Sequence, residues 1–176
     1  MQARYLALSP YNLVRVILGE RFPDDSDQNN VYTRAAAYLN QWIAEGILVR
    51  EPTPSFYAYY QRFTVPDTGE KRERKALIGL GALEDYSAGV VFRHEQTLSG
   101  PKKDRMELLR HTRALCEQLF FLYEDPQLTI DKILDSAAAS DPVLSVTDED
   151  GHLHRMWRIA DPDATASIQQ FMADNQ

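Results

Sequence analysis

The fold is decided by the aromatic stretch Phe56-Tyr57-Ala58-Tyr59-Tyr60-Gln61-Arg62-Phe63-Thr64-Val65. Its aromatic and β-branched side chains favour an extended strand. A second stretch of this kind runs over residues 75–83, after the turn Pro66-Asp67-Thr68-Gly69. We therefore predict a β-hairpin whose solvated end carries the charged run Glu70-Lys71-Arg72-Glu73-Arg74. Gly79 and Gly81 alternate in the second strand, which predicts close approach of another backbone or of a packed side chain.

Four helices are predicted around this hairpin. Residues 31–45 place apolar side chains on one face at a spacing of 3.6 residues, and Gly46 follows as a helix-ending glycine. A second helix is predicted from Pro101 to Glu117, and a third from Pro126 to Ala138 after the capping residue Asp125. The pair Asp161-Pro162 repeats this capping signal ahead of a last helix.

The remaining apolar segments are predicted as strands. Residues 13–18 are apolar and β-branched, and fit either a buried strand or one helical turn, of which we favour the strand. Residues 119–123 form a compact apolar run that is typical of a central strand. Residues 143–147 and 153–159 flank the turn Asp148-Glu149-Asp150-Gly151 and indicate a second hairpin. The predicted fold class is therefore α+β: one domain over residues 1–176, with a mixed sheet of hairpins and crossovers packed against about four helices.

Composition and charge narrow the classes of function. The chain has 176 residues and a net charge of −7, from 26 acidic and 19 basic residues. This balance disfavours broad binding to nucleic acid or to anionic membranes. There is no apolar run of membrane-spanning length and no signal-peptide pattern at the start. The single cysteine, Cys116, cannot form an internal disulfide and fits a small core residue, so we expect a cytoplasmic protein.

The residues with the most chemical potential lie in the segment Arg93-His94-Glu95-Gln96-Thr97-Leu98-Ser99-Gly100-Pro101-Lys102-Lys103-Asp104-Arg105. Glu95 could serve as a general base or hold a metal, and His94 could contact a phosphate; alternatively, Glu95 could pair with Arg93 or Lys102 and only fix the loop. Cations in the first turn of a helix are unfavourable, so Lys102, Lys103 and Arg105 suggest a compensating anion, which could be Glu95, Asp104 or a bound phosphate. Arg110, His111 and Arg113 extend the basic side of the same predicted helix.

Other motifs give weaker signals. His152 and His154 alternate on a predicted strand and so share one face, as in zinc-binding His-x-His pairs, which need a third and a fourth ligand. Asp148 and Asp150 are near but belong to the turn, and the hairpin explains the segment without metal, so no metal site is expected. The tyrosines of the first strand could stack bases, but no clustered basic residues flank them. Dinucleotide-fold, P-loop, zincin and nucleophile-elbow motifs are all missing from the sequence.

The chain resembles a family of bacterial and archaeal proteins, the domain of unknown function numbered 1015. The resemblance covers nearly the whole chain and rests on five segments: Ser9-Pro10-Tyr11-Asn12-Leu13-Val14-Arg15, residues 38–49, Ser55-Phe56-Tyr57-Ala58-Tyr59, the block from His94-Glu95-x-Thr97 to Pro101-Lys102-x-Asp104-Arg105, and Phe120-Phe121-Leu122-Tyr123. Two family motifs are missing, a Pro-Pro-Tyr-Asp start and an Asp-Gly-His-His-Arg motif. By this resemblance the chain looks like an internal piece of a longer protein.

The resemblance also implies a chemistry. The missing Gly-His-His-Arg element is similar to the phosphate-binding motif of the ParB and sulfiredoxin superfamily, which includes free-serine kinases. By that likeness the whole protein would bind ATP or ADP with magnesium and transfer a phosphoryl group, its partner would be a small phosphorylated ligand, and this chain alone would be inactive. Glu95 would be its catalytic residue, Arg93, His94, Thr97, Lys102 and Arg105 would bind phosphate, and Asp104 would fix the loop. The alternatives are a non-catalytic binding or regulatory module and a ParB-like nucleic-acid binder.

Overall fold

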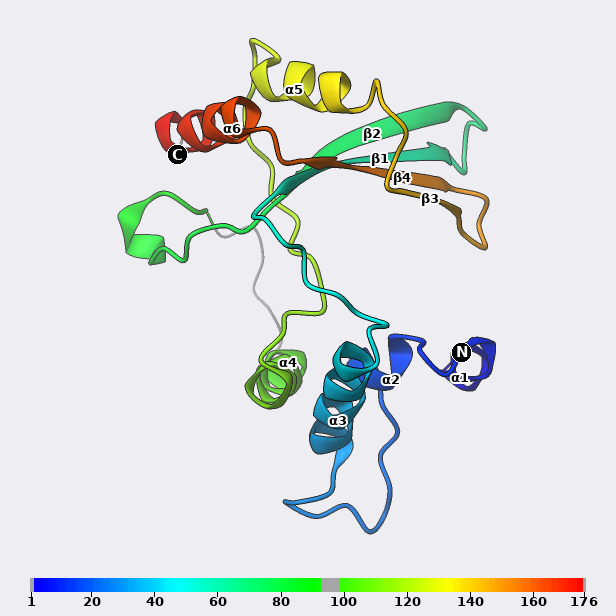
Figure 1. Ribbon diagram of the computed structural model, residues 1–176. Helices are drawn as coiled ribbons and strands as arrows, with labels where there is room; N and C mark the ends of the chain where they lie inside the picture. Colours follow the sequence, from blue (N-terminus) through cyan, green and yellow to red (C-terminus); the bar gives the residue numbers. More distant parts are fainter. Residues whose placement is uncertain (1, 93–98, 176) are drawn as a thin grey trace. The chain divides into compact units, whose positions relative to one another are not determined.

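The computed structural model describes residues 2–92 and 99–175, and it divides into two compact units (Figure 1). Unit 1 comprises Met1–Arg50 and Arg93–Phe120, and unit 2 comprises Glu51–Phe92 and Phe121–Gln176. The described part contains six α-helices, one short 3-10 helix and one four-stranded antiparallel sheet, which confirms the α+β class. None of the described helices is both long enough and apolar enough to traverse a lipid bilayer.

Unit 1 is helical in its described residues. It contains α1 (Gln2–Leu8), α2 (Val14–Ile17), α3 (Val31–Ala44) and α4 (Ser99–Thr112). The predicted helix 31–45 is confirmed as α3. Asn30 caps it: the Asn30 side chain accepts hydrogen bonds from the amides of Tyr32 and Thr33, while the Thr33 hydroxyl accepts one from the Asn30 amide. This reciprocal capping box satisfies amide groups that a helix start would otherwise leave unpaired.

Two predictions in unit 1 are wrong. Residues 13–18 contain the single helical turn α2 (Val14–Ile17) instead of a strand, because the Asn12 side chain accepts the Val14 amide at 3.0 Å and starts the turn there. The helix predicted from Pro101 to Glu117 stops at Thr112. The Thr112 hydroxyl donates to the Leu108 carbonyl at 2.8 Å, and Arg113 turns into the left-handed region at a φ of 52°. A residue with positive φ cannot continue a right-handed helix.

The core of unit 1 forms where α2 and α4 meet α3. Its buried residues are Val16, Ala35, Trp42 and Leu108. Cys116 packs against this cluster, and its partial burial raises the pKa of the thiol. A raised thiol pKa keeps the sulfur protonated and poorly nucleophilic, which agrees with a packing role for Cys116.

Unit 2 is built on the sheet, whose strands are β1 (Phe56–Thr64), β2 (Lys71–Ile78), β3 (Leu144–Thr147) and β4 (Leu153–Ile159). The strand order is β2-β1-β4-β3, and every neighbouring pair is antiparallel. Both predicted hairpins are therefore present, and β4 joins them by pairing with β1. The 3-10 helix η1 (Tyr86–Ala88) follows β2.

Two helices, α5 (Thr129–Ala137) and α6 (Pro162–Asp174), lie on the same side of this sheet (Figure 1). They bury the alternate residues that β1 and β4 direct toward them. The cluster between helices and sheet comprises Ala58, Tyr60, Ile130, Leu134, Trp157, Ile159 and Ile168. The predicted cap of α6 is confirmed, because the Asp161 side chain accepts the Ala164 amide at 2.8 Å. Asp125 likewise accepts the Thr129 and Ile130 amides, but α5 begins at Thr129, three residues later than the predicted start at Pro126.

Other expectations for unit 2 need correction. The second strand of the first hairpin spans Lys71–Ile78, so it begins before the predicted start at Lys75 and includes residues 71–74 of the charged run, which are exposed at the turn end of the hairpin as predicted. Register explains the shift, because Lys71 pairs directly with Thr64 across a short turn. Residues 119–123 form no strand, and all five are exposed; the run crosses the boundary between the two units instead of joining a sheet.

The two glycines after the first hairpin differ. A Cβ added at Gly79 would lie 2.6 Å from two ring carbons of Phe56, so the predicted close approach is confirmed there. At Gly81 no heavy atom of the described chain lies within 4 Å of such a carbon, and the prediction is wrong at that position.

Candidate functional site

Four of the predicted site residues, Arg93, His94, Glu95 and Thr97, lie outside the described residues, and their predicted roles remain untested. The others, Lys102, Asp104 and Arg105, belong to the first turns of α4 in unit 1. The structure therefore describes the predicted site only at the first turns of α4.

Lys102 and Lys103 are both exposed. Within residues 2–92 and 99–175, no carboxylate pairs with either ammonium group. Acidic residues are absent from this first turn, where the helix dipole already concentrates positive charge. Two cations at a helix start, without a carboxylate partner among the described residues, favour the approach of an anion to this end of α4.

Asp104 points toward a different part of unit 1. Its carboxylate accepts a hydrogen bond from Arg21 at 2.7 Å and another from the Tyr32 hydroxyl at 2.8 Å. Tyr32 lies in the first turn of α3, so Asp104 fastens the start of α4 to α3. The guanidinium of Arg21 also lies over the Tyr32 ring, 5.3 Å from its centroid.

Arg105 is directed toward protein groups as well. One terminal nitrogen, Nη1, donates to the Ile17 carbonyl at 3.1 Å, and the other, Nη2, lies 2.7 Å from the Glu117 carboxylate. Both contacts stay within unit 1 and connect α4 to the end of α2 and to the segment after α4. Arg105 is thus placed to position the helix start.

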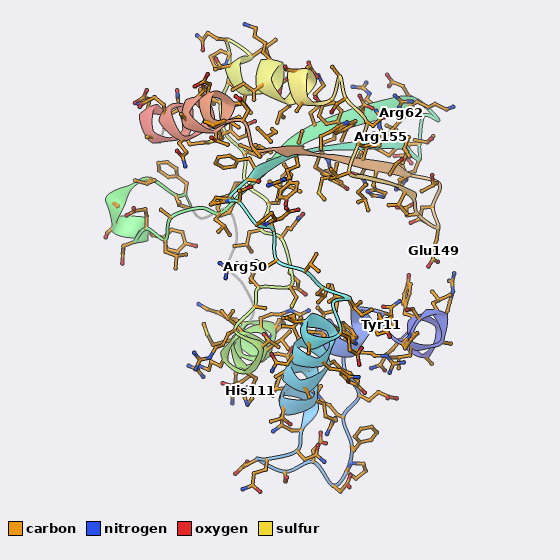
Figure 2. All side chains as sticks on the ribbon, viewed as in Figure 1. Tyr11, Arg50, Arg62, His111, Glu149 and Arg155 are labelled. Carbon is orange, nitrogen blue, oxygen red and sulfur yellow. The ribbon has the colours of Figure 1, made fainter. Side chains whose placement is uncertain are left out.

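The rest of the basic side of α4 is largely engaged in other contacts. Arg110 pairs with Glu107 at 2.5 Å on the same helix. His111, labelled on α4 in Figure 2, stacks on the Tyr32 ring with centroids 5.6 Å apart. Arg113 follows the helix end in its left-handed conformation. Lys102 and Lys103 are therefore the cations of α4 that remain available to a ligand.

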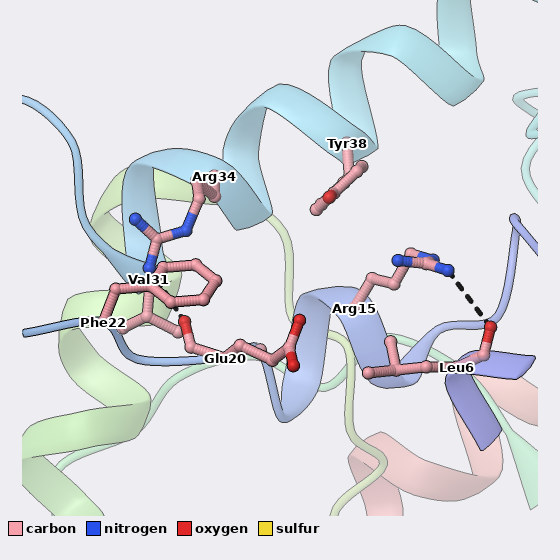
Figure 3. A pocket seen from close by; sticks show the side chains of 8 residues that line it. Leu6, Arg15, Glu20, Phe22, Val31, Arg34 and Tyr38 are labelled. Atoms are coloured by element: carbon pink, nitrogen blue, oxygen red, sulfur yellow. Dashed lines mark hydrogen bonds between the residues drawn. The ribbon is translucent and has the colours of Figure 1, made fainter. Parts of the chain in front are cut away.

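A small cavity in unit 1 was not predicted from the sequence. It has a volume of about 50 Å³ and lies between α2 and α3 (Figure 3), and its walls include Arg15, Glu20, Arg34 and Tyr38. Arg34 is held by Asp25 at 2.7 Å, which lowers the pKa of Asp25. Arg15 donates to the Leu6 carbonyl at 3.1 Å, but its buried Nε atom has no hydrogen-bond partner among the residues that the structure describes. This space suits ordered water and is far too small for a nucleotide.

A second polar cluster lies in unit 2, at the turn between β3 and β4. Both histidines of the predicted His-x-His pair reach the same carboxylate oxygen of Asp148: His154 Nε2 lies 2.9 Å from it and His152 Nδ1 lies 3.4 Å from it. The contact with His154, followed by the His152 amide, lowers the pKa of Asp148. The sequence indicated a shared face for the two histidines but not that Asp148 would lie between them.

The comparisons with known proteins give a family and no described activity. The family described as "Protein of unknown function (DUF1015)" matches residues 1–176, the full length of the chain. Searches of curated proteins and of solved structures found no match. The basic start of α4 and the polar turn of unit 2 are the two polar clusters with chemical potential in the described part of the chain. By the match over its whole length, and in agreement with the resemblance in its sequence segments, this chain belongs to the DUF1015 family.

Proposed function

We propose that this chain carries the phosphate-binding part of a phosphoryl-transfer enzyme, with ATP or ADP and magnesium as the expected ligands. One observation supports the proposal most. The start of α4 bears two exposed lysines without a carboxylate partner in the described chain, while Asp104 and Arg105 hold that start in place. A fixed positive helix start is the geometry that phosphate groups use in many proteins.

The helix dipole determines how charges at the start of α4 affect its stability. A cation in the first turn costs about 0.3–1 kcal/mol when nothing offsets it. A phosphate at the same position reverses the sign of this interaction and adds hydrogen bonds to charged donors, each contributing about 1.5–3 kcal/mol. In the proposal Lys102 and Lys103 bind the phosphate and Arg105 positions the helix. Arg93, His94 and Thr97 are further ligands on the evidence of the sequence, and Glu95 is the general base.

Binding is the first test, by calorimetric titration of the chain with ADP and with pyrophosphate in the presence of magnesium. We expect K102A/K103A to weaken both affinities by about tenfold or more, because two charge-assisted contacts are lost. The control is Lys71→Ala, which removes another exposed lysine at the start of β2. Equal affinities in the wild type and K102A/K103A would contradict the proposed site.

Turnover is the second test, by release of phosphate from ATP, and it uses the whole protein, because this chain alone is expected to be inactive. Glu95→Gln keeps the size of the side chain and removes its basicity, so we expect turnover to be lost while ADP affinity stays within about twofold. Turnover that survives this substitution would remove Glu95 from the mechanism. Binding without any turnover in the wild type would favour a non-catalytic binding or regulatory module.

That second function is favoured by the contacts of Arg105. Its bonds to Ile17 and Glu117 are those of a residue that connects elements of unit 1. If the signature only joins loop to helix, Arg105→Ala lowers the melting temperature and leaves nucleotide affinity unchanged. A ParB-like nucleic-acid binder is disfavoured by the net charge of −7. Salt-sensitive retardation of DNA or RNA in a gel would instead support nucleic-acid binding.

A further inference from the structure

We propose that the turn between β3 and β4 binds a divalent transition metal, with zinc the best fit. Asp148, Asp150 and His152 are the first three ligands, and His154 is the fourth. The site lies wholly in unit 2 and does not depend on the phosphate-binding function proposed for α4. Figure 2 labels Glu149, which belongs to the same turn.

The donor atoms are already gathered. One carboxylate oxygen from each of Asp148 and Asp150 and a ring nitrogen of His152 all lie within 4.8 Å of one another. Zinc bonds of about 2.0–2.2 Å place tetrahedral ligand atoms roughly 3.3–3.6 Å apart. Side-chain rotation can shorten the separations between ligand atoms, now at most 4.8 Å, to this range, because both aspartates are exposed and His152 is only half-buried.

The backbone of the turn holds the ligands in this arrangement. The Oδ1 atom of Asp148 accepts the amides of Asp150 at 3.0 Å and His152 at 2.8 Å. The Asp148 amide donates to the His152 carbonyl at 3.0 Å, and Gly151 takes a φ of 79° to close the turn. With Oδ1 occupied by the turn, Oδ2 is the oxygen that faces both imidazoles.

His154 adds a feature seen in metal-binding histidines. Its Nε2 atom faces Asp148, while its Nδ1 atom lies 2.6 Å from the hydroxyl of Tyr59 on β1. The Tyr59 and His154 rings also stack, with centroids 6.0 Å apart. A partner on the second ring nitrogen fixes the tautomer and orientation of a ligating histidine. In the tautomer that carries its proton on Nδ1, that proton is donated to the Tyr59 oxygen, and the Nε2 lone pair on the side of Asp148 is free to bind a metal.

The chemistry of the donors selects the metal class. Magnesium and calcium prefer sites made only of oxygen ligands. Two imidazole nitrogens with two carboxylates suit zinc, nickel or copper, and zinc accepts four such ligands in a tetrahedron without further geometric demand. The sequence by itself indicated no metal site, because it could not show that turn carboxylates and strand histidines meet at one point.

The test is a competition titration of zinc between the chain and a chromogenic chelator, with calorimetry for stoichiometry. We expect one zinc ion per chain in the wild type. Asp150→Asn and His152→Gln should each weaken zinc binding by about tenfold or more, since each removes a ligand. Tyr59→Phe, which keeps the ring and removes the hydroxyl, should weaken it by about 10- to 100-fold, as outer-shell losses do.

Matched controls use two zinc-capable side chains of unit 1. His111→Gln and Cys116→Ser remove a histidine and the thiol of unit 1, and zinc affinity should not change. Circular dichroism of each variant verifies the fold, which the exposed positions of the turn are expected to preserve. No stoichiometric zinc in the wild type, or an unchanged affinity in both Asp150→Asn and His152→Gln, would overturn the proposal. Loss of affinity in Cys116→Ser alone would also overturn it, because the metal would then lie in unit 1.

Discussion

At the scale of single residues, Asp135 shows how one carboxylate joins a helix to a sheet. Its oxygens accept the Tyr60 hydroxyl at 2.6 Å and the Lys75 ammonium at 2.5 and 2.7 Å. The hydrogen bond from Lys75, followed by that from Tyr60, lowers the pKa of Asp135. The ammonium of Lys75 also lies over the Tyr60 ring, 5.4 Å from its centroid. These contacts tie α5 to β1 and β2 at one point.

The lowered pKa of Asp135 predicts a dependence of stability on pH. The folded chain binds this proton less tightly than the unfolded chain, so the contribution of Asp135 is present above the unfolded pKa, about 3.9, and is lost as the pH falls through the folded pKa. We expect Asp135→Asn to lower the free energy of unfolding at pH 7. The difference in this free energy between the variant and the wild type should become smaller below about pH 4. Urea unfolding at several pH values measures this. Asp67→Asn, at an exposed turn position, is the control, and a difference from the wild type that did not change with pH would contradict the prediction.

At the scale of elements, the end of β2 depends on the absence of a side chain at Gly79. The Phe56 ring occupies the space where a Cβ would lie, at 2.6 Å. We expect Gly79→Ala to destabilise unit 2 by about 1–3 kcal/mol, the range for overpacking. Gly81→Ala is the matched control, because its Cβ would meet open space and its effect should lie within about 0.5 kcal/mol. Chemical unfolding measures the free energy of unfolding of both variants. Equal values would show that the Phe56 ring moves aside without loss of stability.

Elements with local signals were predictable, and those decided by their surroundings were not. Asn30 and Asp161 carry their capping contacts within three residues, so α3 and the start of α6 followed from the sequence. Residues 119–123 have the composition of a central strand, but strand formation needs a neighbour with free hydrogen-bonding groups. Whether such a neighbour exists is set by the whole fold, which composition does not encode.

The candidate site shows the same limit. The basic start of α4 was visible in the sequence, because Pro101 marks a helix start beside two lysines. The partners of Asp104 were not, since Arg21 and Tyr32 are 83 and 72 residues away along the chain. Contacts of this kind have no local pattern, and only the packing of α3 against α4 shows them.

At the scale of the whole molecule, each unit has a buried cluster of its own, and each cluster holds one of the two tryptophans. Trp42 belongs to the cluster of unit 1 and is 3% exposed, while Trp157 belongs to that of unit 2 and is 2% exposed. Trp157 is fixed further by a hydrogen bond from its indole to the Ser140 carbonyl at 2.9 Å. Single-tryptophan variants therefore report the unfolding of the two units separately.

Because each unit has its own buried cluster, a core substitution should destabilise mainly the unit that contains it. Leu134 is fully buried in the cluster of unit 2, so Leu134→Ala should cost about 2–5 kcal/mol there. We expect it to lower the unfolding midpoint reported by Trp157 in a Trp42→Phe background. The midpoint reported by Trp42 in a Trp157→Phe background should shift less.

Leu122→Ala, at a residue 86% exposed in the same unit, is the control and should move neither midpoint by much. Fluorescence during urea titration measures both midpoints. Equal shifts of the two midpoints by Leu134→Ala would show that the chain unfolds as one cooperative body.

The charged run that lies in β2 has a consequence for how copies of this chain meet. β2 is an outer strand of the sheet in the described part of the chain, and an outer strand is where another strand can pair edge to edge. Its first five residues, 71–75, are all charged and exposed. A second molecule that docked there edge to edge would have to align its own charges against them and strip their water. The opposite border, β3, has only four residues. The charged side chains of β2 and the short length of β3 thus disfavour edge-to-edge aggregation of the sheet.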